Sequence, residues 1–194
     1  MYPKLLIKNH KTIKKKGELP TRLVIPATNF TATFYKIGYL GIKRCLDKGK
    51  VNYSRDSIVQ ASDLKEILEE LGVKREEVTI ASVYAINMYP SIKIAIIRKS
   101  VRYFARKITK ETKKTISLCL ELIHFWMSST LISFDGEYYE QHGGEREEQG
   151  LAIGGYKSDF LADLVASYLF EKSKLKFRQT IYHGIYRYDG LVVF

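Results

Sequence analysis

The chain contains 194 residues, of which 32 are Lys or Arg and 21 are Asp or Glu, so its formal net charge is +11. A chain of this length can bury a hydrophobic core without disulfides, and so large a basic excess favours a polyanionic partner, with nucleic acid as the leading class. No stretch of about 18 consecutive apolar residues is present, so the sequence predicts no transmembrane helix and no membrane partner.

Residues 1–18 predict a basic N-terminal arm. Its lysines include Lys14, Lys15 and Lys16, whereas glutamates gather in the distant loop 142–148. This segregation of charge favours contacts between the arm and phosphates over a merely solvated basic face. The arm lacks the arginine and serine that are typical of organelle-targeting segments, so we expect an intracellular chain of undefined compartment.

Residues 19–78 predict a small mixed region. Thr21–Pro26 is rich in β-branched residues and reads as a short strand that ends at proline. Apolar and aromatic residues at helical spacing predict a helix over 33–45. A second helix is expected over 63–71, because Ser62 is a good N-cap and Gly72 a natural C-cap.

Residues 79–194 alternate between strands and amphipathic helices. The run Ile80, Val83 and Tyr84 is strand-like, and the basic helix that follows carries apolar residues at three- and four-residue steps between Arg102, Arg106 and other cations. The remaining predicted elements are a helix through Ile116–Met127, a hairpin over 131–139, a helix over 158–171, a strand over 180–188, a turn at Asp189-Gly190 and a final apolar strand at Leu191–Phe194.

Neither the cysteines nor the histidines show the spacing of a metal site. Cys45 and Cys119 form no C-x-x-C pair, and the four histidines are scattered along the chain. We therefore expect reduced thiols in an intracellular protein and no zinc site.

Three short blocks in the second half of the chain follow one another in a distinctive order. They are Asn87–Ile92 (NMYPSI), Gln149–Ala162 (QGLAIGGYKSDFLA) and Tyr186–Asp189 (YRYD). In this order they resemble motifs A, B and C of the reverse transcriptase family, particularly its Penelope-like and related eukaryotic or viral lineages. The resemblance implies an α+β fold with a fingers-like region at 19–78 and a palm-like region at 79–194, in which an antiparallel palm sheet packs on helices. The chain stops after motif C, so the helical thumb is expected to be absent.

The resemblance also implies where metal-binding carboxylates would lie. In the family, two aspartates on adjacent palm strands hold the two cations that clamp the attacking and leaving oxygens. With Tyr89 in the place of the aromatic residue that guards the sugar, the aspartate of motif A falls on Tyr84. Aligning Tyr186 with the first residue of Y-x-D-D puts Tyr188 at the leading aspartate of motif C and Asp189 at the second.

Both principal ligand positions therefore hold tyrosine. A neutral phenol does not supply the hard anionic oxygen that Mg²⁺ requires, so we expect no cofactor, with Mg²⁺ needed only if polymerase activity is retained. Three alternatives stay open. A gap of one residue would make Asp189 the leading carboxylate, Asp63 or Asp135 could approach from elsewhere, or Tyr84 and Tyr188 could simply form a cross-strand aromatic pair.

The resemblance assigns further roles beside the carboxylate positions. Arg22 is similar to the fingers arginine that meets an incoming triphosphate. Tyr89, Gln149 and Gly150 fall at nucleotide-binding positions, although glycine is also the default for a tight strand-to-helix connection.

The leading hypothesis is a catalytically inactive, reverse-transcriptase-like protein that binds RNA or belongs to a ribonucleoprotein assembly. The first alternative is an RNA-directed DNA polymerase whose aspartates are altered in this chain. The second is a protein-binding scaffold whose basic surface is incidental. The final strand is expected to be an exposed edge that another protein chain covers.

Overall fold

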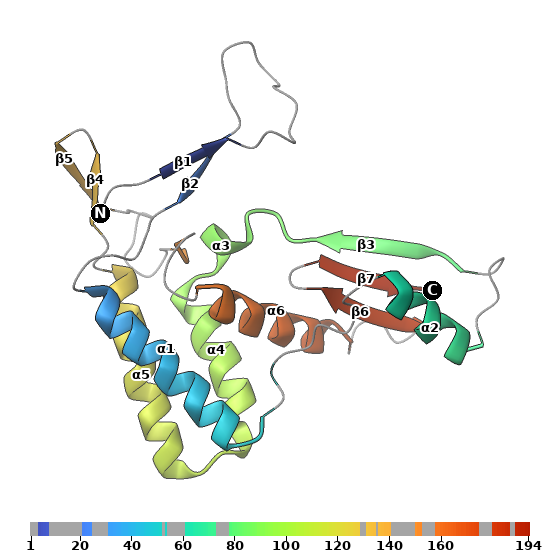
Figure 1. Cartoon of the computed structure of the whole chain (residues 1–194). Helices are drawn as coiled ribbons and strands as arrows, with labels where there is room; N and C mark the ends of the chain where they lie inside the picture. Colours follow the sequence, from blue (N-terminus) through green and yellow to red (C-terminus); the bar gives the residue numbers. More distant parts are fainter. Residues whose placement is uncertain are drawn as a thin grey trace.

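The computed structural model shows an α+β protein that is mostly helical, with a small three-stranded antiparallel main sheet beside a group of helices (Figure 1). It describes residues 4–7, 21–24, 31–51, 53, 61–72, 78–128, 131–134, 136–140, 150–152, 158–174, 180–186 and 189–194. Lys14, Lys15, Lys16, Asp135, Gln149 and Tyr188 lie outside these residues.

Three helices form one side of the molecule: α1 (Thr31–Lys48), α4 (Ile94–Phe104) and α5 (Lys110–Ser128). Figure 1 shows α1 lying along α5, with α4 beside them. In α4, apolar residues at three- and four-residue steps form one face, and Ile94, Ile97, Val101 and Phe104 are all buried. The helices predicted from periodicity in these segments are confirmed.

Close packing between α1 and α5 depends on two glycines of α1. A Cβ atom on Gly38 would lie 2.7 Å from the carbonyl oxygen of Cys119, and one on Gly41 would overlap the Cys119 Sγ. Tyr35 and Trp126 pack against each other between the same helices, with ring centroids 4.4 Å apart and ring planes tilted by 41°. One hydrophobic core therefore spans the predicted fingers-like and palm-like regions.

The main sheet contains β3 (Ile80–Tyr84), β6 (Tyr182–Tyr186) and β7 (Asp189–Val193), in the order β3-β7-β6. Because β7 is antiparallel to both neighbours, β3 and β6 are parallel to each other. Helix α6 (Ser158–Lys174) comes between these two strands in the chain. The arrangement is a split β-α-β unit, in which the last strand is inserted between the first two.

The hairpin that joins β6 to β7 differs from the predicted one. Tyr186 is paired with Asp189, so Asp189 already belongs to β7. The predicted turn at Asp189-Gly190 is therefore wrong. Strand pairing, rather than the turn preference of Asp-Gly, fixes the register.

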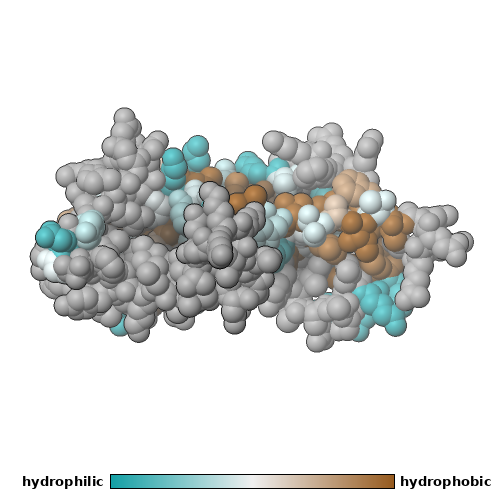
Figure 2. Space-filling view, turned by 90° about the horizontal axis from the view of Figure 1, so that it is seen from above, coloured by the Kyte–Doolittle hydropathy of each residue, from teal (hydrophilic) through white to brown (hydrophobic). Residues whose placement is uncertain are grey.

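The C-terminal strand is not an edge strand. β7 is hydrogen-bonded on both sides, and Val192 and Val193 are buried. The prediction that another chain covers this strand assumed that the strand is an exposed edge, and this assumption is wrong. The apolar edge belongs to β3, where Ile80 and Val83 are about half exposed, and Figure 2 shows hydrophobic surface over this part of the molecule.

The remaining elements are short and peripheral. In Figure 1 the two small hairpins lie apart from the main sheet. The lysine-rich start of the chain contributes a strand that the sequence did not predict. Gly72, the C-cap glycine of the helix Ala61–Glu70, has a positive φ of 66°. These elements are β1 (Lys4–Ile7) paired with β2 (Thr21–Val24), β4 (Leu131–Phe134) paired with β5 (Glu137–Glu140), α2 (Ala61–Glu70), α3 (Met88–Ser91) and the short 3-10 helix η1 (Ala105–Lys107).

Among the helices that the structure describes, none combines the length and the apolar character that a membrane span requires.

Candidate functional site

Strand pairing brings the ends of the first and third motif-like blocks together. Tyr84, the last residue of β3, is directly opposite Asp189, the first residue of β7. Asp189 is in turn directly opposite Tyr186, the last residue of β6. The three residues form one row across the end of the sheet, which we call the Tyr84 row.

The side chains of Tyr84 and Asp189 lie on the sheet face that points away from α4 and α6. Side chains alternate between the two faces of a strand, and the neighbouring residues Val83, Ile185 and Gly190 line a pocket against those helices. Tyr84 is 70% exposed, and Asp189 is exposed as well. The row is therefore open to a ligand from solvent.

The donor set of the Tyr84 row does not fit a pair of Mg²⁺ ions. Its one carboxylate comes from Asp189, whereas Mg²⁺ demands several hard oxygen ligands in near-octahedral geometry. Elsewhere in the described part of the chain, no group of three or more His, Cys, Asp or Glu side chains is arranged to hold a metal ion. Asp63, a residue of α2, is part of no such group.

The register bears on the predicted pair of tyrosines. The residue directly opposite Tyr84 is Asp189, whereas Tyr188 lies outside the described residues, so the cross-strand aromatic pair stays a prediction. Asp189 therefore occupies the position beside the motif A-like strand.

The first and second motif-like blocks meet at Gly150. The backbone of Gly150 forms a bridge with Lys93, and the next residue donates its N–H to the carbonyl oxygens of Tyr89 (2.9 Å) and Ile92 (3.0 Å). A Cβ atom on Gly150 would overlap the carbonyl oxygen of Pro90 and would lie 2.6 Å from the Pro90 Cα. The close approach that requires glycine here is made by the protein's own backbone.

Tyr89 belongs to the same junction. It lies in the short helix α3, which begins after Asn87, a residue in the left-handed region with φ of 48°. Tyr89 is half-buried and packs against the hydrophobic core. The structure thus brings Tyr89 and Gly150 together, and Tyr89 follows shortly after the end of β3 in the chain.

Arg22 lies in a different part of the structure. It belongs to β2 and is paired with Leu6 of β1. This hairpin is separate from the main sheet in Figure 1. The structure therefore does not place Arg22 in the strands that carry the Tyr84 row.

The predicted basic residues of α4 and η1 form an exposed cluster with an aromatic residue. Arg102 and Arg106 are exposed, and the Arg106 guanidinium lies 4.1 Å from the centroid of the Tyr103 ring. Lys172 of α6 approaches the same ring, with its Nζ at 5.3 Å. We call these residues the Tyr103 cluster. Lys172 was missed in the sequence because only folding brings α6 beside the end of α4.

One arginine of α4 has a structural partner instead. The Arg98 guanidinium donates to both carboxylate oxygens of Glu121, at 2.9 and 3.1 Å. This pair connects α4 to α5 and distinguishes Arg98 from the exposed Arg102 and Arg106.

Comparison with solved structures finds the same fold in a telomerase. An apo telomerase from Candida tropicalis, truncated from its C-terminal domain, superimposes with a TM-score of 0.58 over 99% of this chain, at 13% sequence identity. The chain spans 43% of the length of that telomerase chain. No protein-family model matches the sequence, and no curated protein matches it. At this identity the likeness shows a shared fold.

Proposed function

We propose that this chain is a reverse-transcriptase-like protein without polymerase activity that binds RNA as a component of a ribonucleoprotein assembly. The observation that carries the proposal is the pairing of Tyr84 with Asp189 across β3 and β7. In the family that the three sequence blocks resemble, this pair of strands supplies the metal-binding carboxylates. The fold shared with a telomerase also supports a reverse-transcriptase-like protein.

The chemistry of the Tyr84 row argues against nucleotidyl transfer. Two-metal catalysis needs anionic oxygens from both strands to hold the cations beside the reacting phosphate. Tyr84 offers a neutral phenol, which leaves Asp189 as the one carboxylate of the row. An exposed aromatic ring is instead suited to stacking on an unpaired base, because every base has a π-face.

The charge of the chain supports an RNA partner. The net charge is +11, and the Tyr103 cluster combines the exposed Arg102, Arg106 and Lys172 with a half-buried aromatic ring. Single-stranded nucleic acid is bound by such combinations, since cations follow the phosphates while rings stack on bases.

Primer extension tests the loss of catalysis. The unmodified chain is expected to extend no primer with Mg²⁺ or Mn²⁺. The matched variants are Tyr84→Asp with Tyr188→Asp, which restores two carboxylates, and Tyr84→Asn with Tyr188→Asn, which makes the same change in size without the charge. Extension by the unmodified chain would refute the proposal.

The second candidate function is an active polymerase. Among the possible metal sites, the position of Asp189 opposite Tyr84 favours one in which Asp189 is the leading carboxylate. If Asp189 were the leading carboxylate of a rebuilt metal site, the unmodified chain would extend a primer and Asp189→Asn would abolish that activity. Loss of activity in Asp189→Asn together with activity in the unmodified chain would establish this alternative.

Salt dependence tests RNA binding separately. For single strands each neutralised phosphate contributes roughly 0.7 to the slope of log affinity against log salt. Changing Arg102 and Arg106 to glutamine should therefore reduce the slope by about 1.4. Lys65→Gln on α2, where Lys65 pairs with Glu69 at 3.7 Å, is the control and should leave it unchanged. A slope near zero in the unmodified chain would instead favour the scaffold alternative.

A further inference from the structure

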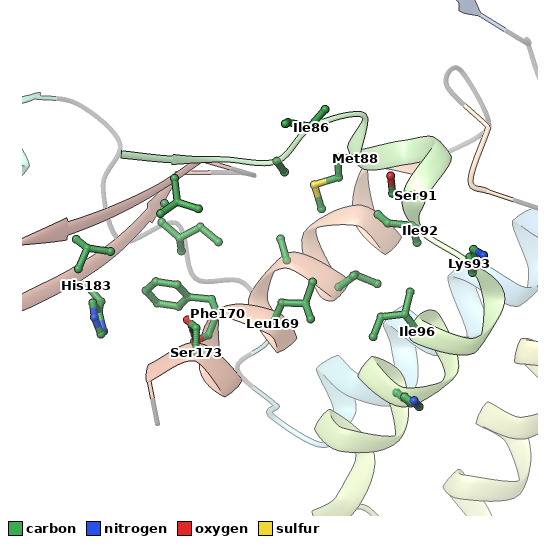
Figure 3. A pocket seen from close by; sticks show the side chains of 18 of the residues that line it. Ile86, Met88, Ser91, Ile92, Lys93, Ile96, Leu169, Phe170, Ser173 and His183 are labelled. Carbon is green, nitrogen blue, oxygen red and sulfur yellow. Dashed lines mark hydrogen bonds between the residues drawn. The ribbon is translucent and has the colours of Figure 1, made fainter. Parts of the chain in front are cut away.

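A pocket of about 690 Å³ lies between the main sheet and the helices α4 and α6. Its three walls are visible in Figure 3. Ile92 and Ile96 come from the α4 side, and Leu169 and Phe170 from α6. The sheet closes the pocket with the face opposite the Tyr84 row, so the pocket is separate from that site.

Most of the side chains that line the pocket are apolar, and its charged side chains are all positive. Among the residues that the structure describes, the charged side chains that line the pocket are Lys93 and Lys99, both on the α4 side, and none is a carboxylate. His183 lies on the far side and is within 2.6 Å of the Thr180 hydroxyl. The positive charge is therefore concentrated along one wall.

The size of the pocket fits a small molecule. Ligand sites in proteins commonly measure about 300 to 1,000 Å³, and the pocket falls within this range. A nucleotide would leave its base edges and ribose hydroxyls without partners against such walls, which carries a free-energy cost. A hydrocarbon chain would instead gain by leaving water.

The lysines define the other end of the ligand. A lysine can rest its aliphatic stem along an apolar wall while its ammonium group reaches an anion. Lys99 lines the pocket and is exposed, so its ammonium group is accessible to a ligand. A hydrogen bond from an ammonium group to a carboxylate is stronger than one between neutral groups. We propose that this pocket binds a long-chain carboxylate, with its hydrocarbon tail between the sheet and α6 and its carboxylate at Lys99.

The full chain is titrated with palmitate below the concentration at which it forms micelles. The expected result is saturable binding, with hexadecanol at least about tenfold weaker because it lacks the negative charge. Octanoate should also bind at least about tenfold more weakly than palmitate, because it buries fewer methylene groups.

Three variants locate the site. Lys99→Glu should weaken palmitate binding by about tenfold or more, since it replaces attraction by repulsion. Ala95→Trp fills the pocket from an exposed position of α4 and should abolish binding. Lys114→Glu makes the same charge change on an exposed lysine of α5 that does not line the pocket, and should leave binding unchanged.

Circular dichroism of each variant confirms that the helices are intact. Absence of palmitate binding, or equal affinity for palmitate and hexadecanol, would overturn the proposal. So would unchanged binding by both Lys99→Glu and Ala95→Trp. None of these results depends on RNA binding or on polymerase activity.

Discussion

Tyr84 of β3 and Asp189 of β7 are directly opposite each other. An aromatic residue and a carboxylate are therefore paired at the exposed end of the sheet. If both strands carried a carboxylate here, the two like charges would be directly opposite and would require a cation between them. Tyrosine at position 84 removes that requirement.

The first prediction follows from this pairing. Tyr84→Asp should lower the unfolding midpoint in chelator, because like charges directly opposite in a sheet destabilise by roughly 0.2–1 kcal/mol. Millimolar Mg²⁺ should restore part of the loss. Tyr84→Asn shares the loss of the aromatic ring but not the added charge, so its midpoint should not respond to Mg²⁺. An equal response of both variants in thermal unfolding would contradict the prediction.

The second prediction concerns the junction between Gly150 and Pro90. Gly150→Ala should destabilise the protein by about 1–3 kcal/mol, because a Cβ atom would overlap the Pro90 carbonyl oxygen and the backbone would have to move. Gly190→Ala is the matched control, since its Cβ would lie 3.5 Å from the Val83 Cβ, an ordinary contact. Urea unfolding measures both. The prediction fails if the two variants are equally stable.

The third prediction tests the close packing of α1 on α5. Gly41→Ala should cost about 1–3 kcal/mol, because the added methyl group meets the Cys119 Sγ. Removing that sulfur with Cys119→Ala should make the same glycine substitution much less costly. The double-mutant cycle should therefore show a favourable coupling of at least about 0.5 kcal/mol. Strict additivity would show that the two residues are not in contact.

The fourth prediction concerns alkaline stability. Tyr35 is fully buried, and desolvation of its phenolate raises the pKa of the Tyr35 hydroxyl well above its usual value near 10, despite the hydrogen bond to Ser158. The folded state therefore holds this proton more tightly than the unfolded state does. The resulting stabilisation is present below about pH 10 and is lost as the pH rises above it.

Tyr35→Phe has no proton to lose at this position. Its stability should fall less steeply than that of the unmodified chain above about pH 10, as measured by circular dichroism in urea. Tyr139→Phe removes an exposed phenol and serves as the control. Parallel pH profiles for the unmodified chain and Tyr35→Phe would count against the assigned role of burial.

Much of the local structure was predictable because local spacing encodes it. The apolar stripe of α4 and the cap at Gly72 depend on neighbouring residues, and the structure has both. The turn at Asp189-Gly190 was predicted from a local preference and is wrong, because pairing with β3 and β6 extends β7 through both residues. Lys172 in the Tyr103 cluster had no local signal, because its partners are on another helix.

By itself, the sequence determined the basic charge, the positions of the main helices and the order of the three motif-like blocks, since each depends on residue type and on short-range spacing. Only the tertiary structure decided that Asp189 is the residue opposite Tyr84, that β7 is the central strand and that Gly150 packs on Pro90. These relationships depend on hydrogen bonds and contacts between segments that are remote in the chain. A shift of one residue in strand register reverses the face to which each side chain points, and the spacing of residues along the chain does not specify it.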